Sequence, residues 1–260
     1  MLTNLRELFA TYELVWAWTF RIIRARYQQS VLGGLWAILQ PTATVAIFSI
    51  IFTLFVPVDT KGVPYVVFSY VAMVPWTLFS SSITDMADSL VGNMNLVTKI
   101  YFPREVLPIA SLLARVIDYL IAFLVVAVLI LYYRMPVAPL GWLFIPLILL
   151  TQVALALGLG LIGAALNVFY RDIRLIIVLS LQIWFYASPI IYPVTSVPAR
   201  LRSFYYLNPM AGIIEAYRAV ILHQSLPDIN LLLSASVAVL LLVVGYVFFK
   251  RVEPQYADVV

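Results

Sequence analysis

The strongest constraint on this sequence is a series of apolar stretches, each near the length needed to cross a lipid bilayer. A spanning helix needs about 20 mostly apolar residues, because the hydrocarbon core is roughly 30 Å thick and each residue rises about 1.5 Å. Six stretches of this kind occur, over residues 31–58, 62–84, 106–133, about 140–170, 175–189 and 229–249. The sequence therefore predicts an all-α integral membrane protein with six transmembrane helices.

Composition excludes an ordinary soluble domain. The chain is 64% hydrophobic and 11% charged, whereas soluble domains are roughly 45–50% apolar and about 25% charged. It has no cysteine and one histidine, which excludes thiol catalysis, disulfides and the usual zinc ligand sets, so no metal site is expected. The formal net charge of +4 is modest and gives no support to nucleic-acid binding.

We interpret residues 1–260 as one transmembrane domain. Residues 1–30 carry apolar side chains at three- and four-residue spacing, which predicts an amphipathic helix in the membrane surface; a solvated arm is the alternative. Residues 31–184 hold spans one to five, with a loop at 85–105, and the sixth span at 229–249 precedes a tail at 250–260. Lys and Arg in short loops number ten on the N-terminal side and five on the other, which predicts cytoplasmic termini.

Residues 187–228 are neither a clean span nor an ordinary loop, because prolines and charged residues are mixed with many apolar ones. Asn208 before Pro209 is a good helix start, and Glu215 with Arg218 forms an i,i+3 pair. We expect an external re-entrant gate here, two short helices that dip into the outer leaflet before the last span. An external loop with one amphipathic helix is the alternative.

Charged residues inside the spans are few. Arg115 and Asp118 lie three residues apart in the third span, and therefore on one helix face. A lone charge at the bilayer centre costs roughly 2.5–3.5 kcal/mol on insertion scales, so we expect an intramembrane ion pair; a proton relay is the alternative. Asp85 and Asp88 close the second span and are expected to be solvated at a helix end.

The loop after the second span combines apolar and basic residues, which suits docking into a groove of another protein. A connector packed on the membrane surface is the alternative. No Gly directly precedes a Lys in the chain, so the phosphate-binding loop of ATP hydrolysis is missing. The candidate docking residues are Asn95, Leu96, Lys99, Tyr101, Phe102 and Arg104.

An aromatic cluster lies at the outer end of the predicted fifth span. Trp184, Tyr186 and Tyr192 are candidates to line a glycan path, because aromatic faces pack on sugar C–H groups while tyrosine hydroxyls bond to sugar hydroxyls. Interfacial anchoring explains the same residues without any sugar.

Several motifs carry a resemblance to a known family. They are residues 26–36 (RYQQSVLGGLW) with QP at 40–41, residues 99–108 (KIYFPREVLP), 167–174 (NVFYRDIR), 188–193 (SPIIYP), 208–210 (NPM) and 253–258 (EPQYAD). In this order they resemble the permease subunits of type-2 ABC exporters for O-antigen, capsule and teichoic acid, and the likeness covers nearly the whole chain. Gly34 departs from the family pattern, in which proline is common at this place.

The resemblance implies a transport subunit that is not itself an enzyme and binds no cofactor. Two copies would pair, each with a nucleotide-binding subunit that holds ATP and Mg²⁺, and export undecaprenyl-diphosphate-linked polysaccharide across the bacterial inner membrane. Residues 95–102 would be the coupling helix, with Arg171 and Asp172 close to it. Arg24 and Arg26 would suit the lipid diphosphate, since guanidinium groups bind phosphate oxygens well; positive-inside anchoring explains them equally well.

Other functions stay open. An ATP-independent flippase of lipid-linked sugars, or a secondary transporter, would use Arg115 and Asp118. A type-2 exporter of a drug or another lipid would use the aromatic cluster only for packing. An enzyme acting on lipid-linked sugars is disfavoured by the scarcity of His, Cys and paired intramembrane carboxylates.

Overall fold

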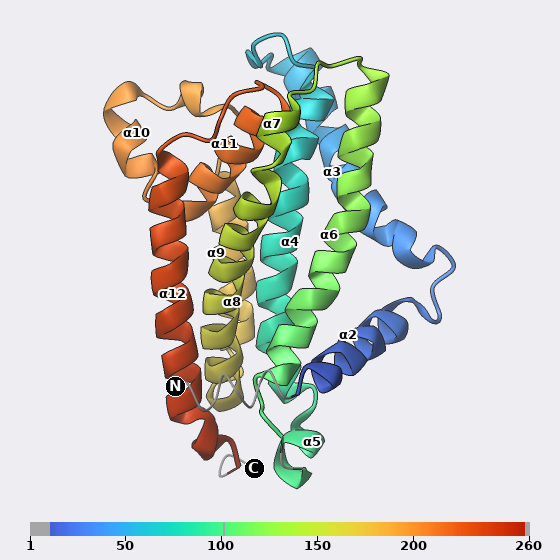
Figure 1. Ribbon diagram of the computed structural model, residues 1–260, viewed down its shortest axis with the longest axis vertical. Coiled ribbons are helices and arrows are strands. Elements are labelled where there is room, and N and C mark those ends of the chain that lie inside the picture. Colours follow the sequence, from blue (N-terminus) through green and yellow to red (C-terminus); the bar gives the residue numbers. More distant parts are fainter. Residues whose placement is uncertain (1–10, 101, 258–260) are drawn as a thin grey trace.

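The computed structural model describes residues 11–100 and 102–257. Within these residues every regular element is a helix (Figure 1), which confirms the predicted all-α class. The longer helices are α2 (Tyr12–Tyr27), α3 (Trp36–Ile50), α4 (Tyr65–Val91), α6 (Val106–Tyr132), α8 (Ile145–Phe169), α9 (Ile173–Tyr186), α11 (Pro209–Ile221) and α12 (Asn230–Val252). The shorter ones are α5 (Met94–Lys99), α7 (Pro139–Trp142), α10 (Ala199–Tyr205), η1 (Gly33–Leu35), η2 (Ile51–Phe55), η3 (Val194–Ser196) and η4 (Glu253–Ala257).

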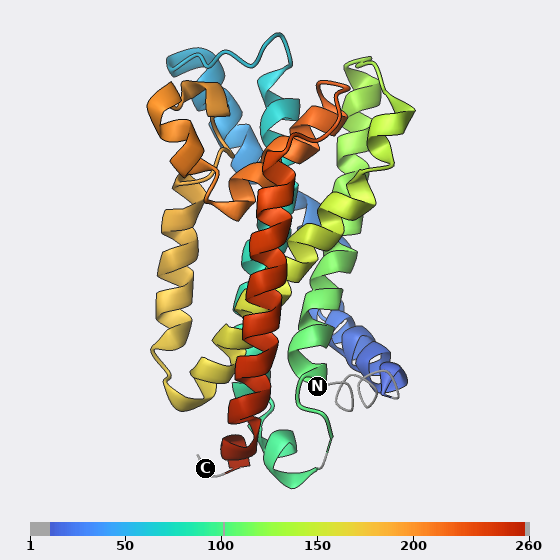
Figure 2. The same ribbon diagram turned by 60° about the vertical axis from the view of Figure 1, so that its left-hand side comes forward.

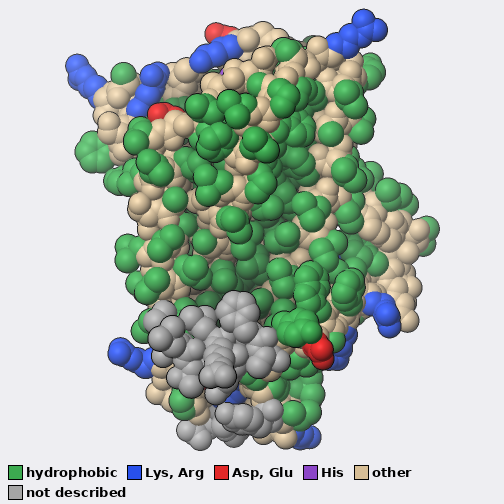
Figure 3. Space-filling model, in the orientation of Figure 1, with side chains coloured by type: hydrophobic (Ala, Val, Ile, Leu, Met, Phe, Trp, Pro, Cys, Tyr) green, Lys and Arg blue, Asp and Glu red, His purple; other side chains and the backbone are tan. Residues whose placement is uncertain are grey.

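Five helical stretches in the described part of the chain are long and apolar enough to cross a membrane: Gly33–Phe55, Tyr65–Val91, Val106–Tyr132, Pro139–Phe169 and Asn230–Tyr256. Together they indicate a multi-pass membrane protein. Figure 3 shows hydrophobic side chains over the middle of one face and Lys and Arg side chains near its two ends. The predicted fifth span is α9, whose 14 residues extend only about 21 Å. The predicted count of six spans therefore depends on α9.

Helix α4 is the centre of the bundle, in contact with α3, α6, α8, α9 and α11. Two buried amides of α8 fasten it. Gln152 Nε2 donates to the Pro75 carbonyl at 2.7 Å, and Asn167 Nδ2 donates to the Ala87 carbonyl at 2.9 Å. Such bonds favour helix association in lipid, where burying apolar surface between helices gives little net gain.

Helices α8 and α12 approach each other closely enough for backbone contact. A Cβ atom at Gly245 would lie 2.2 Å from the Gly158 carbonyl oxygen, and one at Gly158 would lie 2.5 Å from the Leu241 carbonyl carbon. Small residues permit this approach between membrane helices. The two glycines therefore determine the spacing of α8 and α12.

Helix α2 lies obliquely beside the lower part of α6 (Figures 1 and 2) and packs mainly against it. Tyr12, Trp16 and Phe20 follow one another at intervals of one helical turn, and each is about half exposed. The Trp16 and Phe20 rings stack with centroids 5.9 Å apart. Residues 1–10 of the predicted interfacial helix lie outside the described residues.

The chain turns back after α9, at the end of the bundle opposite α5 (Figure 2). Helix α10 lies on the outside there, while every residue of α11 except Glu215 and Ala219 is buried, against α4, α8 and α12. The start of α11 is as predicted, since the Asn208 side chain accepts a 3.0 Å hydrogen bond from the Met210 N–H. This burial is deeper than an amphipathic helix on an external loop would have.

Replacing Gly245 with Ala should force α8 and α12 apart, because the added methyl group would overlap a backbone oxygen. Overpacking of this kind costs about 1–3 kcal/mol, so the thermal unfolding midpoint of the protein in detergent should fall. Gly34→Ala is the matched control, since a Cβ there meets only Ile121 Cδ1 at 4.0 Å. Equal midpoints for the two variants would contradict the close packing.

Candidate functional site

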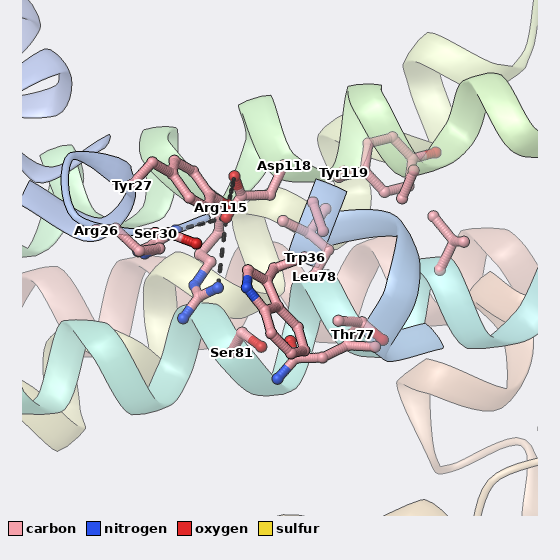
Figure 4. Close-up of a pocket in the computed structure, with 14 residues that line it drawn as sticks. Arg26, Tyr27, Ser30, Trp36, Thr77, Leu78, Ser81, Arg115, Asp118 and Tyr119 are labelled. Atoms are coloured by element: carbon pink, nitrogen blue, oxygen red, sulfur yellow. Dashed lines mark hydrogen bonds and ion pairs between the residues drawn. The ribbon is translucent and has the colours of Figure 1, made fainter. Parts of the chain in front are cut away.

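A cavity of about 300 Å³ lies between α2, α3, α4 and α6 (Figure 4). Its wall is mixed, with the aromatic rings of Trp36 and Tyr119 beside polar and charged groups. A polar cavity among apolar helices is a candidate functional site, because polar groups at membrane depth are costly unless they are paired or wet. The polar and charged side chains on the wall are Arg26, Tyr27, Ser30, Gln40, Thr77, Ser81, Arg115 and Asp118.

Two arginines and two aspartates form one ion-pair network beside this cavity. Arg26, near the end of α2, donates from Nη2 to Asp85 Oδ2 on α4 at 2.8 Å and from Nη1 to Asp118 Oδ2 on α6. Arg115 on α6 makes two bonds to Asp85, from Nε at 2.7 Å and from Nη2 at 3.1 Å. Tyr27 donates its hydroxyl to Asp118 Oδ1 at 2.8 Å. The network therefore joins α2, α4 and α6.

The network is electrically balanced, with two positive and two negative groups. Its side chains are only 10–27% exposed, so each charge is largely removed from water. An unpaired charge in a membrane is costly, and a guanidinium that bonds a carboxylate twice is among the strongest protein hydrogen-bonding arrangements. Pairing between residues of three helices thus offsets the free-energy cost of burying each charge.

The structure places Arg115 Nη1 3.4 Å from Asp118 Oδ2, the longest ion pair of the network. The shorter bonds of Arg115 go to Asp85, and those of Asp118 go to Arg26 and Tyr27. The expectation that Asp85 is solvated at a helix end is wrong, because α4 continues to Val91 and Asp85 faces both arginines. Sequence reasoning missed this contact because no local pattern relates α2 to α4.

The two basic residues predicted to meet a diphosphate have different surroundings. Arg26 is held by two carboxylates. Arg24 is exposed, and among the described residues it has no ion pair. The guanidinium group open to an added anion is therefore that of Arg24.

The three aromatic residues predicted to line a glycan path do not line this cavity. Trp184 donates its indole N–H to Asn208 Oδ1 at 2.7 Å and meets the Phe79 ring edge-on at 5.2 Å. Tyr192 donates its hydroxyl to the Tyr186 carbonyl at 3.0 Å, and the Tyr186 side chain is exposed. Trp184 thus helps to position the start of α11, while Tyr186 presents its ring at the surface.

Helix α5 protrudes from one end of the bundle and carries the predicted docking segment (Figures 1 and 2). Val97 is buried, Leu96 is half-buried, and Phe102 is half-buried against the core. Tyr101 lies outside the described residues. The exposed residues on α5 and just after it are Asn95, Thr98, Lys99 and Ile100.

Two neighbouring loops complete this end of the bundle. Arg171 and Asp172, predicted to lie near the docking segment, are exposed between α8 and α9. Arg174 Nε lies 3.3 Å from Asp88 Oδ2, which ties the start of α9 to α4. Arg104 is bonded to Glu253 of η4 rather than pointing freely into solvent.

A second cavity, of about 170 Å³, lies at the end of the bundle opposite α5. Its walls are the loop before α4, helix α10 and helix α11. Arg218 on its wall is only 1% exposed. Its guanidinium donates to Glu215 Oε1 and to the Ile190 carbonyl, both at 2.9 Å, and lies 3.6 Å from the Phe68 ring centre. The predicted pair of Glu215 and Arg218 is confirmed. Burial, together with the nearby charge of Lys61, lowers the pKa of His223 on the same wall.

A family model described as ABC-2 type transporter matches residues 13–222. The chain belongs to the ABC-2 type transporter family. The match begins in α2 and ends just after α11, so it includes the ion-pair network, the predicted docking segment and the buried helix α11. The resemblance stated from motifs is thereby confirmed.

Similarity to individual proteins covers more of the chain than residues 13–222. The chain is 30% identical over 264 residues to the O-antigen export system permease protein RfbA of Myxococcus xanthus, with 99% of each chain covered. It is 29% identical to a protein of the same name from Klebsiella pneumoniae, with 95% of each covered. It is 24% identical to the polysialic acid transport protein KpsM of Escherichia coli, with 78% of each covered.

Replacing Asp85 with Asn should destabilise the protein, because both arginines then share one carboxylate. Leaving a buried polar partner unsatisfied costs about 1–3 kcal/mol, and more for charged groups. The unfolding midpoint in detergent should fall for Asp85→Asn and be unchanged for Asp59→Asn, an exposed loop position. The double variant Asp85→Asn/Arg115→Met is balanced in charge and should recover part of the loss. Additive losses would mean that the residues are not coupled.

Proposed function

We propose that this chain is the transmembrane subunit of an ATP-binding-cassette exporter that moves undecaprenyl-diphosphate-linked polysaccharide, an O-antigen or similar cell-surface glycan, across the bacterial inner membrane. The observation that carries this proposal is the 30% identity, over 99% of the chain, to a protein named as an O-antigen export permease. The multi-pass helical bundle is consistent with it, because a lipid-linked cargo must be moved within the membrane.

The energy comes from a separate nucleotide-binding subunit that holds ATP and Mg²⁺, since the chain lacks the Gly-Lys step of a phosphate-binding loop. That subunit docks on α5, where Asn95, Lys99 and Ile100 are exposed on a protruding helix. Arg171 and Asp172 are exposed in a loop at the same end and extend the contact.

In this scheme both termini and the α5 end face the cytoplasm. The ten-to-five distribution of Lys and Arg over the two sides supports this orientation. Helix α2 lies in the membrane interface, which suits its exposed aromatic residues. Helix α9 is the fifth of six spans, and α10 with α11 forms a re-entrant pair, which the burial of α11 supports.

Two copies of the chain pair and enclose the path of the glycan. This is supported by two neighbouring helices, α3 and α9, of which few residues are buried within one copy. They lie side by side, since the rings of Phe48 in α3 and Phe185 in α9 stack with centroids 6.0 Å apart. Trp184, Tyr186 and Tyr192 then lie toward the outer end of the path. Arg24 offers the exposed guanidinium for the lipid diphosphate at the opposite end.

Replacing Ile100 with Asp should disrupt docking of the ATPase subunit, because an exposed apolar contact becomes a buried, unpaired charge on binding. Copurification of the two subunits should fall about tenfold or more, which corresponds to roughly 1.4 kcal/mol, and ATP-dependent export in proteoliposomes should fall with it. Ile229→Asp is the matched control, an apolar residue that is 70% exposed at the opposite end. Unchanged copurification for Ile100→Asp would refute docking at α5.

Replacing Arg24 with Gln should lower export while leaving the amount of assembled complex and its basal ATP hydrolysis unchanged, because only the diphosphate contact is lost. A charge-assisted hydrogen bond contributes about 1.5–3 kcal/mol, which predicts a fall of about tenfold in the apparent affinity for lipid-linked substrate. Arg21→Gln is the control, since Arg21 lies on the same helix with its guanidinium 4.2 Å from the Trp18 ring centre. Equal effects of the two variants would assign Arg24 to membrane anchoring alone.

A further inference from the structure

We propose that Lys250, Glu253 and Tyr256 form a clasp that holds the connection between α5 and α6 against the ends of α8 and α12, and that these three are positioning residues for ATP-driven transport. The inference rests on the proposed function, because it concerns how movement of α5 reaches the spans. The clasp lies beyond residue 222, the last residue of the family match.

The ionic part of the clasp joins α12 to the start of α6. Lys250 Nζ lies 2.7 Å from Glu105 Oε2 and 2.9 Å from Glu253 Oε2. Glu105 is completely buried, and the Lys250 side chain is 16% exposed. A buried ion pair contributes little net stability compared with apolar packing, but breaking one is strongly unfavourable. The pair is therefore better suited to specifying one arrangement of these helix ends than to stabilising the fold.

A second set of contacts reaches the segment that follows α5. The Arg104 backbone N–H donates to Glu253 Oε1 at 3.3 Å, and the Arg104 guanidinium donates to the Glu253 backbone carbonyl. Glu253 thus binds Arg104 through both its side chain and its main chain while it also binds Lys250. One residue of the tail therefore connects the α5–α6 segment with α12.

The aromatic part of the clasp ends in a fully buried ring. Tyr256 is 0% exposed, with its ring centroid 5.8 Å from that of Phe169 at the end of α8 and 5.7 Å from that of Phe249 in α12. The Arg104 guanidinium lies 5.7 Å from the same ring centre. Tyr256 therefore gathers α8, α12 and the α5–α6 segment around one side chain.

The position of α5 explains why such a clasp matters. Helix α5 protrudes beyond the ends of the spans, and η4 is one of its main neighbours (Figures 1 and 2). A short helix on two connecting segments passes on a displacement only if it is fastened to packed elements, because packed interiors are stiff and loops are not. The clasp supplies that fastening to α8 and α12, in addition to the direct chain connections to α4 and α6.

The test uses the full chain with its ATPase subunit in proteoliposomes and measures export per ATP hydrolysed, together with basal hydrolysis and the amount of assembled complex. Lys250→Met removes the charge and shortens the side chain by one atom, Lys250→Arg keeps the charge, and Tyr256→Ala removes the ring. Arg251→Met is the matched control, because Arg251 is the next residue, is exposed, and has no ion pair among the described residues.

For equal amounts of assembled complex, we expect Lys250→Met and Tyr256→Ala to lower export per ATP about fivefold or more, the lower bound of a typical coupling effect, while basal hydrolysis per complex stays near that of the unaltered protein. Lys250→Arg and Arg251→Met should keep the original ratio. An unchanged ratio in both Lys250→Met and Tyr256→Ala, or an equal loss in Arg251→Met, would overturn the clasp. If the unaltered chain bound no ATPase subunit, the proposed function would fail instead.

Discussion

Neutralisation of charge between helices determines how α2, α4 and α6 meet in this apolar bundle. Arg26, Asp85, Arg115 and Asp118 come from three helices, and none of the four has a complete set of partners on its own helix. Because a buried charge without a partner is costly, the contacts of Arg26 fix where the end of α2 meets α4 and α6. The polar cavity lies beside the network, where these three helices and α3 meet.

The same rule operates at both ends of the bundle with different residues. Glu105 and Lys250 pair at the start of α6, and Arg218 pairs with Glu215 within the buried helix α11. The first pair joins segments that are far apart in the sequence. The second lies within one helix that α4, α8 and α12 surround. Buried charges of this protein are therefore paired, either between helices, as with Glu105 and Lys250, or within one helix, as with Glu215 and Arg218.

Hydrophobic length is a local property, so the long helices were predictable from the sequence: α6 and α12 begin and end within a few residues of the predicted stretches. The second span was predicted to end at Thr84 because charged residues follow. Helix α4 instead continues to Val91, because Asp85 is neutralised by arginines of α2 and α6. No pattern within one helix reveals partners on others. Likewise, the mixture of apolar and basic residues after the second span led to the prediction of a docking segment, but the burial of Val97 and of Tyr256 depends on tertiary packing.

Where Gly158 and Gly245 meet, no side chain separates α8 from α12. Side chains normally let neighbouring helices slide by small changes of rotamer, and this pair lacks that freedom. We therefore expect α8 and α12 to move together at this crossing rather than to slide past each other. Separation of helices is then expected at α3 and α9 instead, because few residues of these two helices are buried.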